Sequence, residues 1–231
     1  MNGQQKIIRY GLYILGLLIL ALGLTLNTKT GMGVSPIISI AYSVSLLWNL
    51  NFGDMTFLLY LVCVAVEIAL QRKQNLVRNL VQIPISLVFS RVLNLYDAVI
   101  VYDCTKQPLV MNLLLLAAAM ICTGVGAALT VQMQLPPNPG DGIVAAIGMA
   151  IGKEQGIAKN MVDACCVVST CILGLVVAGK IVGIGLGTVL AMICVGRVMS
   201  LFNGTLRVPL CTAAGLIEKG ESLCEVPAAS R

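Results

Sequence analysis

The sequence predicts an all-α polytopic membrane protein with about six transmembrane helices and two re-entrant half-helices, built as an inverted repeat. Apolar residues make up 58% of the 231-residue chain and charged residues only 11%, and the mean hydropathy is +0.94. A soluble domain carries about a quarter charged residues, so this composition indicates helices that lie in lipid. Several apolar runs are long enough to cross a bilayer, and two shorter runs open with a proline.

Residues 1–103 are expected to form the first repeat unit. Lys6 and Arg9 precede the first apolar run, which is longer than the core of a signal peptide and is not followed by a small-residue cleavage site. Pro84 lies near the start of the last run of this unit, where proline is tolerated or kinks the helix. The expected elements are spans over about 10–28, 54–71 and 81–101 and a half-helix over 36–48.

Residues 104–203 are expected to form the second unit, and residues 204–231 a cytoplasmic tail. The tail is polar and mixed, so we expect no firm structure there, with a short interfacial helix as the alternative. The expected elements of the second unit are spans over about 109–132, 157–178 and 184–202 and a half-helix over 139–152.

The two halves match at an offset of 103 residues. After a slip of three, the run from Ser90 to Asp97 also aligns with the run from Gly196 to Asn203. Because each unit has three crossings, an odd number, the second unit enters from the opposite face and the repeat is inverted, as in many transporters. The pairs at offset 103 include Gly23 with Gly126, Pro36 with Pro139, Ile40 with Ile143, Gly53 with Gly156, Cys63 with Cys166 and Leu70 with Leu173.

The distribution of basic residues supports this topology. If both short helices return to the side they entered, ten basic residues lie on one side, three on the other, and Arg91 and Arg197 within spans. The positive-inside rule then places both termini in the cytoplasm. If either short helix crossed fully, the bias would weaken. The ten are Lys6, Arg9, Arg72, Lys73, Arg78, Lys153, Lys159, Arg207, Lys219 and Arg231, and the three are Lys29, Lys106 and Lys180.

The start of each half-helix carries the same local signals. Asn138 is a good N-cap, Pro139 suits the first helical position, and Asp141 falls in the first turn. Ser35 and Pro36 repeat the cap and the proline in the first unit. Two interrupted segments in corresponding places point to a transport site, although a pair of ordinary interfacial turns is the alternative.

A half-helix that begins inside the membrane directs unpaired N–H groups and a partial positive charge at whatever lies there. Two such ends, entering from opposite faces, suit an anionic group such as a carboxylate, or they exclude cations. Flanking glycines permit close backbone approach, and free carbonyls could hold a coupling ion. The predicted substrate-binding residues are Ser35, Pro36, Asn138, Pro139, Gly140 and Asp141.

Asp141 and Asp163 each have a structural and a functional interpretation. Asp141 either caps its half-helix or serves in proton or cation coupling, or pairs with an amine of the substrate. Asp163 is spaced i,i+4 from Lys159, so the two either neutralise one another or Asp163 belongs to a polar pathway. Glu67 lies a little over one helical turn before Arg72, and we expect it near the inner interface.

Arg91 and Arg197 are candidate pathway residues because arginine is costly within a span. At the centre of a helix the cost is about 2.5–3.5 kcal/mol on insertion scales. Arg197 lies less than two helical turns from its expected span end, where its side chain can snorkel to the headgroups. Arg91 sits nearer the middle of its expected span, but the alignment of the two halves ends that span near Asp97, which brings Arg91 equally close to an interface. The functional alternative is that the pair lines opposite vestibules related by the pseudo-twofold axis.

Three stretches carry a resemblance to a known family: residues 31–39 (GMGVSPIIS), residues 139–142 (PGDG) and the spaced glycines at 183, 185 and 187. Over about residues 8–203 the chain resembles the YczE/YyaS-type bacterial membrane proteins, which are distantly similar to the YitT group. The first motif often reads Gly-x-x-Pro-Trp-Asp in such proteins, whereas here Pro36 is followed by two isoleucines. The resemblance implies a multi-pass protein of the bacterial cytoplasmic membrane, of the kind described as uncharacterised or as a candidate transporter. It supplies no substrate.

Three functional classes follow. The first is a secondary transporter for a small polar or anionic solute, with a proton or sodium as the coupling ion; the second is a passive channel; the third is a non-transport assembly or regulatory factor. An enzyme is not expected, because there is no histidine, no GxSxG elbow and no nucleotide-binding loop. Six of the nine cysteines lie in apolar spans and none forms a CxxC pair, so no metal or cofactor is expected. The expected partners are the bilayer and the solute, with a homo-oligomer left open and no nucleic acid.

Overall fold

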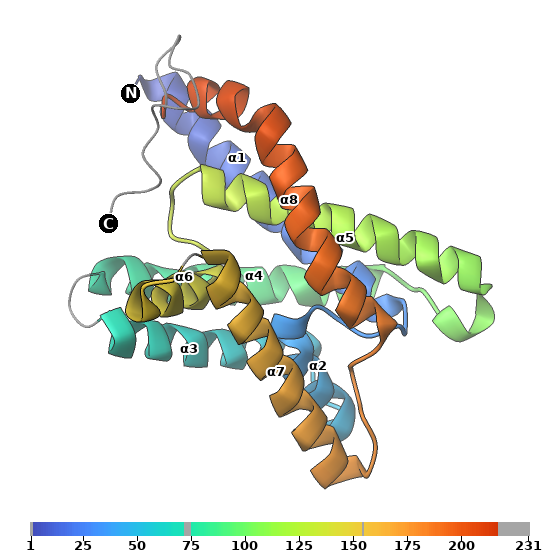
Figure 1. Cartoon of the computed structure of the whole chain (residues 1–231). Helices are drawn as coiled ribbons and strands as arrows, with labels where there is room; N and C mark the ends of the chain where they lie inside the picture. Colours follow the sequence, from blue (N-terminus) through green and yellow to red (C-terminus); the bar gives the residue numbers. More distant parts are fainter. Residues whose placement is uncertain (1, 72–74, 154, 217–231) are drawn as a thin grey trace.

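The computed structural model describes residues 2–71, 75–153 and 155–216. Within these ranges the chain is all-helical, with eight α-helices, one 3-10 turn and no strand (Figure 1). The helices are α1 (Gly3–Lys29), α2 (Pro36–Trp48), α3 (Phe52–Gln71), α4 (Leu76–Val99), α5 (Leu109–Gln132), α6 (Pro139–Ile151), α7 (Gln155–Ala178) and α8 (Leu186–Ala213), with the 3-10 turn η1 (Cys104–Lys106) between α4 and α5.

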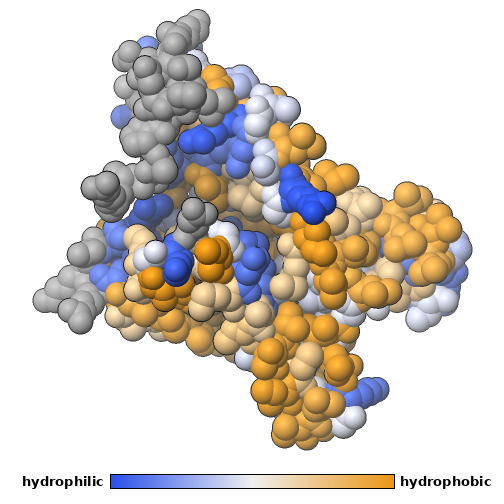
Figure 2. Space-filling view, viewed as in Figure 1, coloured by the Kyte–Doolittle hydropathy of each residue, from blue (hydrophilic) through white to orange (hydrophobic). Residues whose placement is uncertain are grey.

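Six of these helices are long and apolar enough to cross a membrane, as the sequence predicts. The other two, α2 and α6, have 13 residues each. At 1.5 Å per residue they reach about 20 Å, short of the roughly 30 Å hydrocarbon core. In the view of Figure 2, hydrophobic residues cover most of the projecting parts of α5 and α7. The chain is a multi-pass membrane protein.

The centre of the fold is an antiparallel pair formed by α1 and α5. Small residues allow the close approach: Gly16 of α1 packs on Leu129 of α5, and Gly23 packs on Ala119 and Thr123. As the residue number rises along α1 it falls along α5, which gives the antiparallel sense. Small residues at such interfaces let helix backbones approach closely in lipid, where dispersion contacts drive helix association. Outside this pair, α4 packs on α1 and α8 packs on α5.

The two short helices begin and end in the same way. Pro36 and Pro139 occupy the first helical position, where a missing N–H costs nothing. Each helix then stops at a residue in the left-handed conformation, Asn49 with φ 51° and Gly152 with φ 62°. Such residues commonly end helices because they let the chain turn and satisfy the last carbonyls. The bounds 36–48 confirm the prediction, and 139–151 differs from it by one residue.

The short helices pack mainly on the third helix of the other half. α2 packs on α7 and α3, and α6 packs on α3 and α7. The neighbouring long helices differ between the halves: α3 and α4 form an extensive contact, whereas α7 and α8 diverge from one another (Figure 1).

Three helix boundaries differ clearly from the prediction. Helix α1 begins at Gly3 and not near residue 10, so Lys6 and Arg9 belong to the helix. The last helix was expected to end at residue 202, but α8 continues to Ala213 with Pro209 inside it. Its end is held by packing, because Ala214 lies in a buried cluster with Tyr13 of α1 and Met133. Helix α4 begins at Leu76 and not at residue 81, so polar residues of its first turns belong to the helix. The expected tail beyond residue 216 lies outside the described residues.

Candidate functional site

The first turns of α2 and α6 meet inside the protein. A Cβ built on Gly140 would lie 3.2 Å from Cδ1 of Ile37, so the isoleucine side chain covers the glycine. Ile37 also packs on the apolar cluster of Val144, Ala158 and Val162, which joins α6 to α7. We call these two first turns, with the facing side chains of α3 and α7, the half-helix junction.

The two short helices run away from the junction in opposite directions. At the start of α6, Asn138 Nδ2 donates to Tyr60 Oη at 3.0 Å, and Tyr60 lies near the middle of α3. Further along α6, Gly142 packs on Glu67, close to the end of α3. Helix α2 leads instead to the connection between α7 and α8, where Ser43 Oγ donates to the carbonyl of Val182 at 2.6 Å. The N-terminal ends therefore lie deep in the protein.

A non-helical segment precedes each of the two short helices. Before α2, Val34 N–H donates to the Gly183 carbonyl at 3.2 Å, and Gly187 N–H donates to the Met32 carbonyl at 2.7 Å. Gly33, with φ 96°, lies so close to the Gly185 backbone that no side chain fits. This contact gives a physical reason for the spaced glycines at 183, 185 and 187.

The segment before α6 is held by α1. Arg9 Nε donates to the Met133 carbonyl at 2.8 Å, and Tyr13 Oη donates to the Pro136 carbonyl at 2.6 Å. These bonds satisfy carbonyls of a segment that forms no helix of its own. Polar backbone at membrane depth is tolerated when protein groups satisfy it in this way.

Neither N-cap side chain caps its helix. The side chains of Ser35 and Asn138 make no capping hydrogen bond, and Asn138 is bound to Tyr60 instead. In the described part of the chain, the N–H groups of Ile37 and Gly140 form no hydrogen bond either. Two unpaired backbone donors therefore lie at facing helix N-termini, where a partial positive charge favours a hydrogen-bond acceptor.

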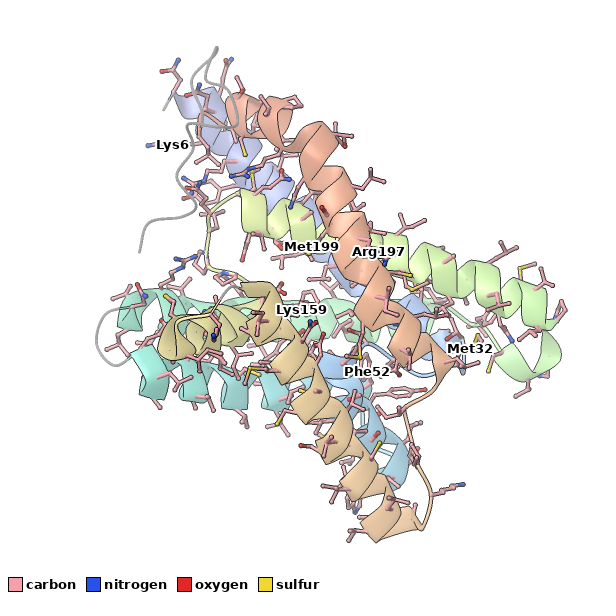
Figure 3. All side chains as sticks on the ribbon, in the orientation of Figure 1. Lys6, Met32, Phe52, Lys159, Arg197 and Met199 are labelled. Atoms are coloured by element: carbon pink, nitrogen blue, oxygen red, sulfur yellow. The ribbon has the colours of Figure 1, made fainter. Side chains whose placement is uncertain are left out.

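Charged side chains gather on the α6 and α7 side of the junction. Lys159 Nζ lies 3.2 Å from Asp163 Oδ2, and Asp163 is only 2% exposed (Figure 3 labels Lys159). This ion pair confirms the predicted i,i+4 pairing. Asp141 is partly exposed and lies within electrostatic range of both residues. No hydrogen bond or ion pair from the described residues reaches its carboxylate, so it is available to a bound group.

Glu67 belongs to the junction as well, although the sequence places it near the inner interface. It is 1% exposed, and Gln82 Nε2 donates to its Oε2 at 2.9 Å. A Cβ on Gly142 would lie 2.5 Å from its Oε1, so the carboxylate occupies the space beside the α6 backbone. An acidic residue within an apolar span is itself a signal of function.

The opposite side of the junction carries hydroxyl groups in place of acids. Ser39 Oγ and Thr170 Oγ1 lie 2.7 Å apart, and both residues are fully buried. Thr170 stands 103 positions after Glu67, and Gly142 stands 103 positions after Ser39. The contact between α2 and α7 thus corresponds to the contact between α3 and α6, with a neutral pair in place of the carboxylate.

The structure does not bring the two candidate arginines to the junction. Arg91 is exposed on α4, where its Nη1 lies 2.9 Å from Asp54 Oδ1 at the start of α3. Arg197 is exposed on α8 (Figure 3). The other predicted site residues all lie at the start of the short helices or beside it, at Ser35, Pro36, Asn138, Pro139, Gly140, Asp141 and Asp163.

A cavity of about 390 Å³ lies elsewhere, between α1 and α4. Its walls are apolar, formed by side chains such as Leu17, Val88 and Phe89, and it offers no polar group to orient a polar ligand. The chemistry of the chain is therefore concentrated at the junction and not at this cavity.

Comparison with known proteins places the chain in a family. It is 23% identical over 194 residues to the protein described as "Uncharacterized protein YyaS" of Bacillus subtilis (strain 168), and the match covers 84% of this chain and 92% of that protein. No solved structure matches the chain. The family described as "Family of unknown function (DUF6198)" matches residues 7–204, which include all eight helices except the last turns of α8 and the first residues of α1. The chain therefore belongs to the DUF6198 family, and its resemblance to the YyaS-type proteins is confirmed.

Proposed function

We propose that the protein is a secondary transporter for a small polar solute, which binds at the half-helix junction. The observation that carries this proposal is the contact of Ile37 with Gly140, where two oppositely directed helices present unpaired N–H groups to one point. Interrupted helices whose N-termini meet near the midplane are a recurrent way to bind a solute inside a membrane.

The packing of the helices supports an inverted repeat. The contact of α1 with α4 corresponds to that of α5 with α8, the contact of α2 with α3 to that of α6 with α7, and the contact of α2 with α7 to that of α6 with α3. The two units differ in the packing of their last two long helices. Helices α3 and α4 pack closely, whereas α7 and α8 diverge. We propose a second state in which α7 and α8 pack together and α3 and α4 diverge. Alternation between the two states would open the junction to each side of the membrane in turn.

The two ends of the junction favour opposite groups of a solute. The first turn of α2 contains no acidic residue, so its N–H groups suit a carboxylate or another acceptor. The α6 end carries Asp141, whose free carboxylate suits an ammonium or another donor. A solute with both an acceptor and a donor, such as an amino acid or a related zwitterion, fits both ends.

We place the protein in the bacterial cytoplasmic membrane with both termini in the cytoplasm. The support is the ten-to-three distribution of the basic residues in the six-span topology. Ile37 fills the contact between the half-helices, which favours a transporter that must rearrange over a channel with a standing pore.

Reconstitution into proteoliposomes tests this function. A panel of radiolabelled amino acids, amines and carboxylates is offered with and without an inward proton or sodium gradient, and exchange is measured by counterflow. We expect saturable counterflow of at least one zwitterion and its accumulation under one gradient. Flux that does not saturate and shows no counterflow would identify a channel, and no flux of any solute would remove transport as the function.

A further inference from the structure

Glu67 is the carboxyl group most fully enclosed by the junction. Only 1% of the residue is exposed, and the same holds for its partner Gln82 on α4. The Gln82 amide donates to Oε2, while Oε1 has no hydrogen-bond partner among the described residues. A buried ionised carboxylate is costly unless it is paired with a cation or fully hydrogen-bonded.

No cation within the described part of the chain forms an ion pair with Glu67. Arg78 on α4 attracts the carboxylate at longer range, and Cys63 lies near it on α3 itself. The other helices packed on α3 contribute one ionisable side chain each, Asp141 from α6 and Tyr42 from α2. The environment is thus short of positive charge and short of donors, which favours a carboxyl group that carries a proton.

The α6 backbone holds the carboxyl group at a defined place. A Cβ on Gly142 would lie 2.5 Å from Oε1 and 2.8 Å from Oε2, so a side chain at position 142 would displace the carboxyl group of Glu67. Gly142 stands two residues after Gly140, so the carboxyl group lies beside the same first turn of α6 that carries the unpaired Gly140 N–H group. Any movement of α6 relative to α3 therefore moves the surroundings of Glu67.

We propose that Glu67 is the proton-binding residue of this protein and, resting on the proposed function, that its proton is the coupling ion. Oε1 takes a proton from hydronium, leaving water, and later returns it to a water molecule on the other side. Glu67 is enclosed while α3 and α4 are packed together. When these helices part in the way that α7 and α8 do here, water reaches the carboxyl group and the proton exchanges.

Infrared spectroscopy of the purified protein in lipid bilayers tests proton binding without a solute. During titration from alkaline to acid pH, the C=O stretching band of a protonated carboxyl group should appear. The band should be absent in Glu67→Gln, which keeps the size of the side chain, and present in Asp163→Asn. Persistence of the same band in Glu67→Gln, or its absence from the unaltered protein, would overturn the proposal.

A second pair of variants checks the contact with α6. Gly142→Ala should shift the frequency of the Glu67 band, because the added methyl group displaces the carboxyl group. Gly11→Ala is the matched control, since a Cβ there meets nothing within 4 Å. An unshifted band in Gly142→Ala would show that the carboxyl group is not held against α6.

Transport measurements test the coupling role separately. Glu67→Gln should abolish accumulation driven by a proton gradient while counterflow of the same labelled zwitterion persists. Undiminished proton-driven accumulation in Glu67→Gln would overturn the coupling role and leave the transport function standing. If the unaltered protein moves no solute, the proposed function fails and takes the coupling role with it, and the infrared band still decides whether Glu67 binds a proton.

Discussion

Ile37 of α2 covers Gly140 of α6, and this contact joins two helices whose first turns lie 103 positions apart in the sequence. Both helices point their uncapped N-terminal ends at it. The glycine lets the isoleucine approach the backbone of α6. The distance between the N-terminal ends of α2 and α6 therefore depends on the size of the side chains at positions 37 and 140.

Gly140→Val should block transport by adding bulk at the junction. A Cβ at this position already lies 3.2 Å from Ile37, so the valine methyl groups would force the two helix ends apart. We expect solute uptake to fall at least tenfold and the double variant Gly140→Val/Ile37→Ala to recover part of it. Gly196→Val on α8 is the control, because a Cβ there meets nothing within 4 Å. Normal uptake in Gly140→Val at normal membrane abundance would exclude this contact from the site.

Asp141→Asn should weaken the binding of the solute's cationic group without destabilising the protein. The carboxylate has no hydrogen-bond or ion-pair partner in the described part of the chain, so its replacement breaks no internal bond. We expect a raised KM for zwitterions, an unchanged melting temperature, and little effect on carboxylates that lack an amine. The loop variant Asp103→Asn is the control. If Asp141 only capped α6, asparagine would serve nearly as well and uptake of every solute would persist.

Arg91→Leu should leave transport nearly unchanged. The guanidinium is bound to Asp54 on an exposed surface, and pairs of this kind contribute about 0.2–1 kcal/mol. We therefore expect normal insertion, a small decrease in thermal stability and an unaltered KM in the proteoliposome assay. A large loss of transport with normal abundance would instead place Arg91 in a vestibule of the pathway.

Single cysteines should be labelled from opposite sides of the membrane at the two ends of α4. In a variant without the native cysteines, Lys106→Cys in η1 should react with an impermeant maleimide in intact cells. Arg78→Cys in the first turn of α4 should react only after the membrane is opened. Reaction of both positions from the same side would contradict the six-span topology and the inverted repeat with it.

The short helices could be predicted closely because their limits depend on local chemistry. A cap residue followed by Pro36 or Pro139 marks each start, and Asn49 or Gly152 in the left-handed conformation marks each end. The end of α8 could not be predicted in this way. It extends past Pro209 because Ala214 packs on α1, and such a contact between distant parts of the chain leaves no local signal.

The candidate site was predicted in part. The composition places Glu67 within an apolar span, but only the packing of α6 shows that it faces a helix and not the headgroup region. In the same way, the bond from Asn138 to Tyr60 joins residues 78 positions apart, so the sequence predicts a cap where the structure has a contact between helices. Arg91 has a partner, Asp54, that becomes visible only when α3 and α4 lie side by side.

A reversible cross-link tests whether the facing ends of α2 and α6 form the solute site. Ile37→Cys and Gly140→Cys are combined in a background without the native cysteines, and uptake of a labelled zwitterion is measured in proteoliposomes before oxidation, after it and after reduction. A Cβ at position 140 would lie 3.2 Å from Cδ1 of Ile37 and 3.8 Å from its Cγ1 and Cγ2, so the two positions are direct neighbours. We expect the disulfide to form, uptake to stop and reduction to restore it, while neither single variant responds to oxidation. Uptake that continues unchanged with the cross-link in place would show that these helix ends do not form the solute site.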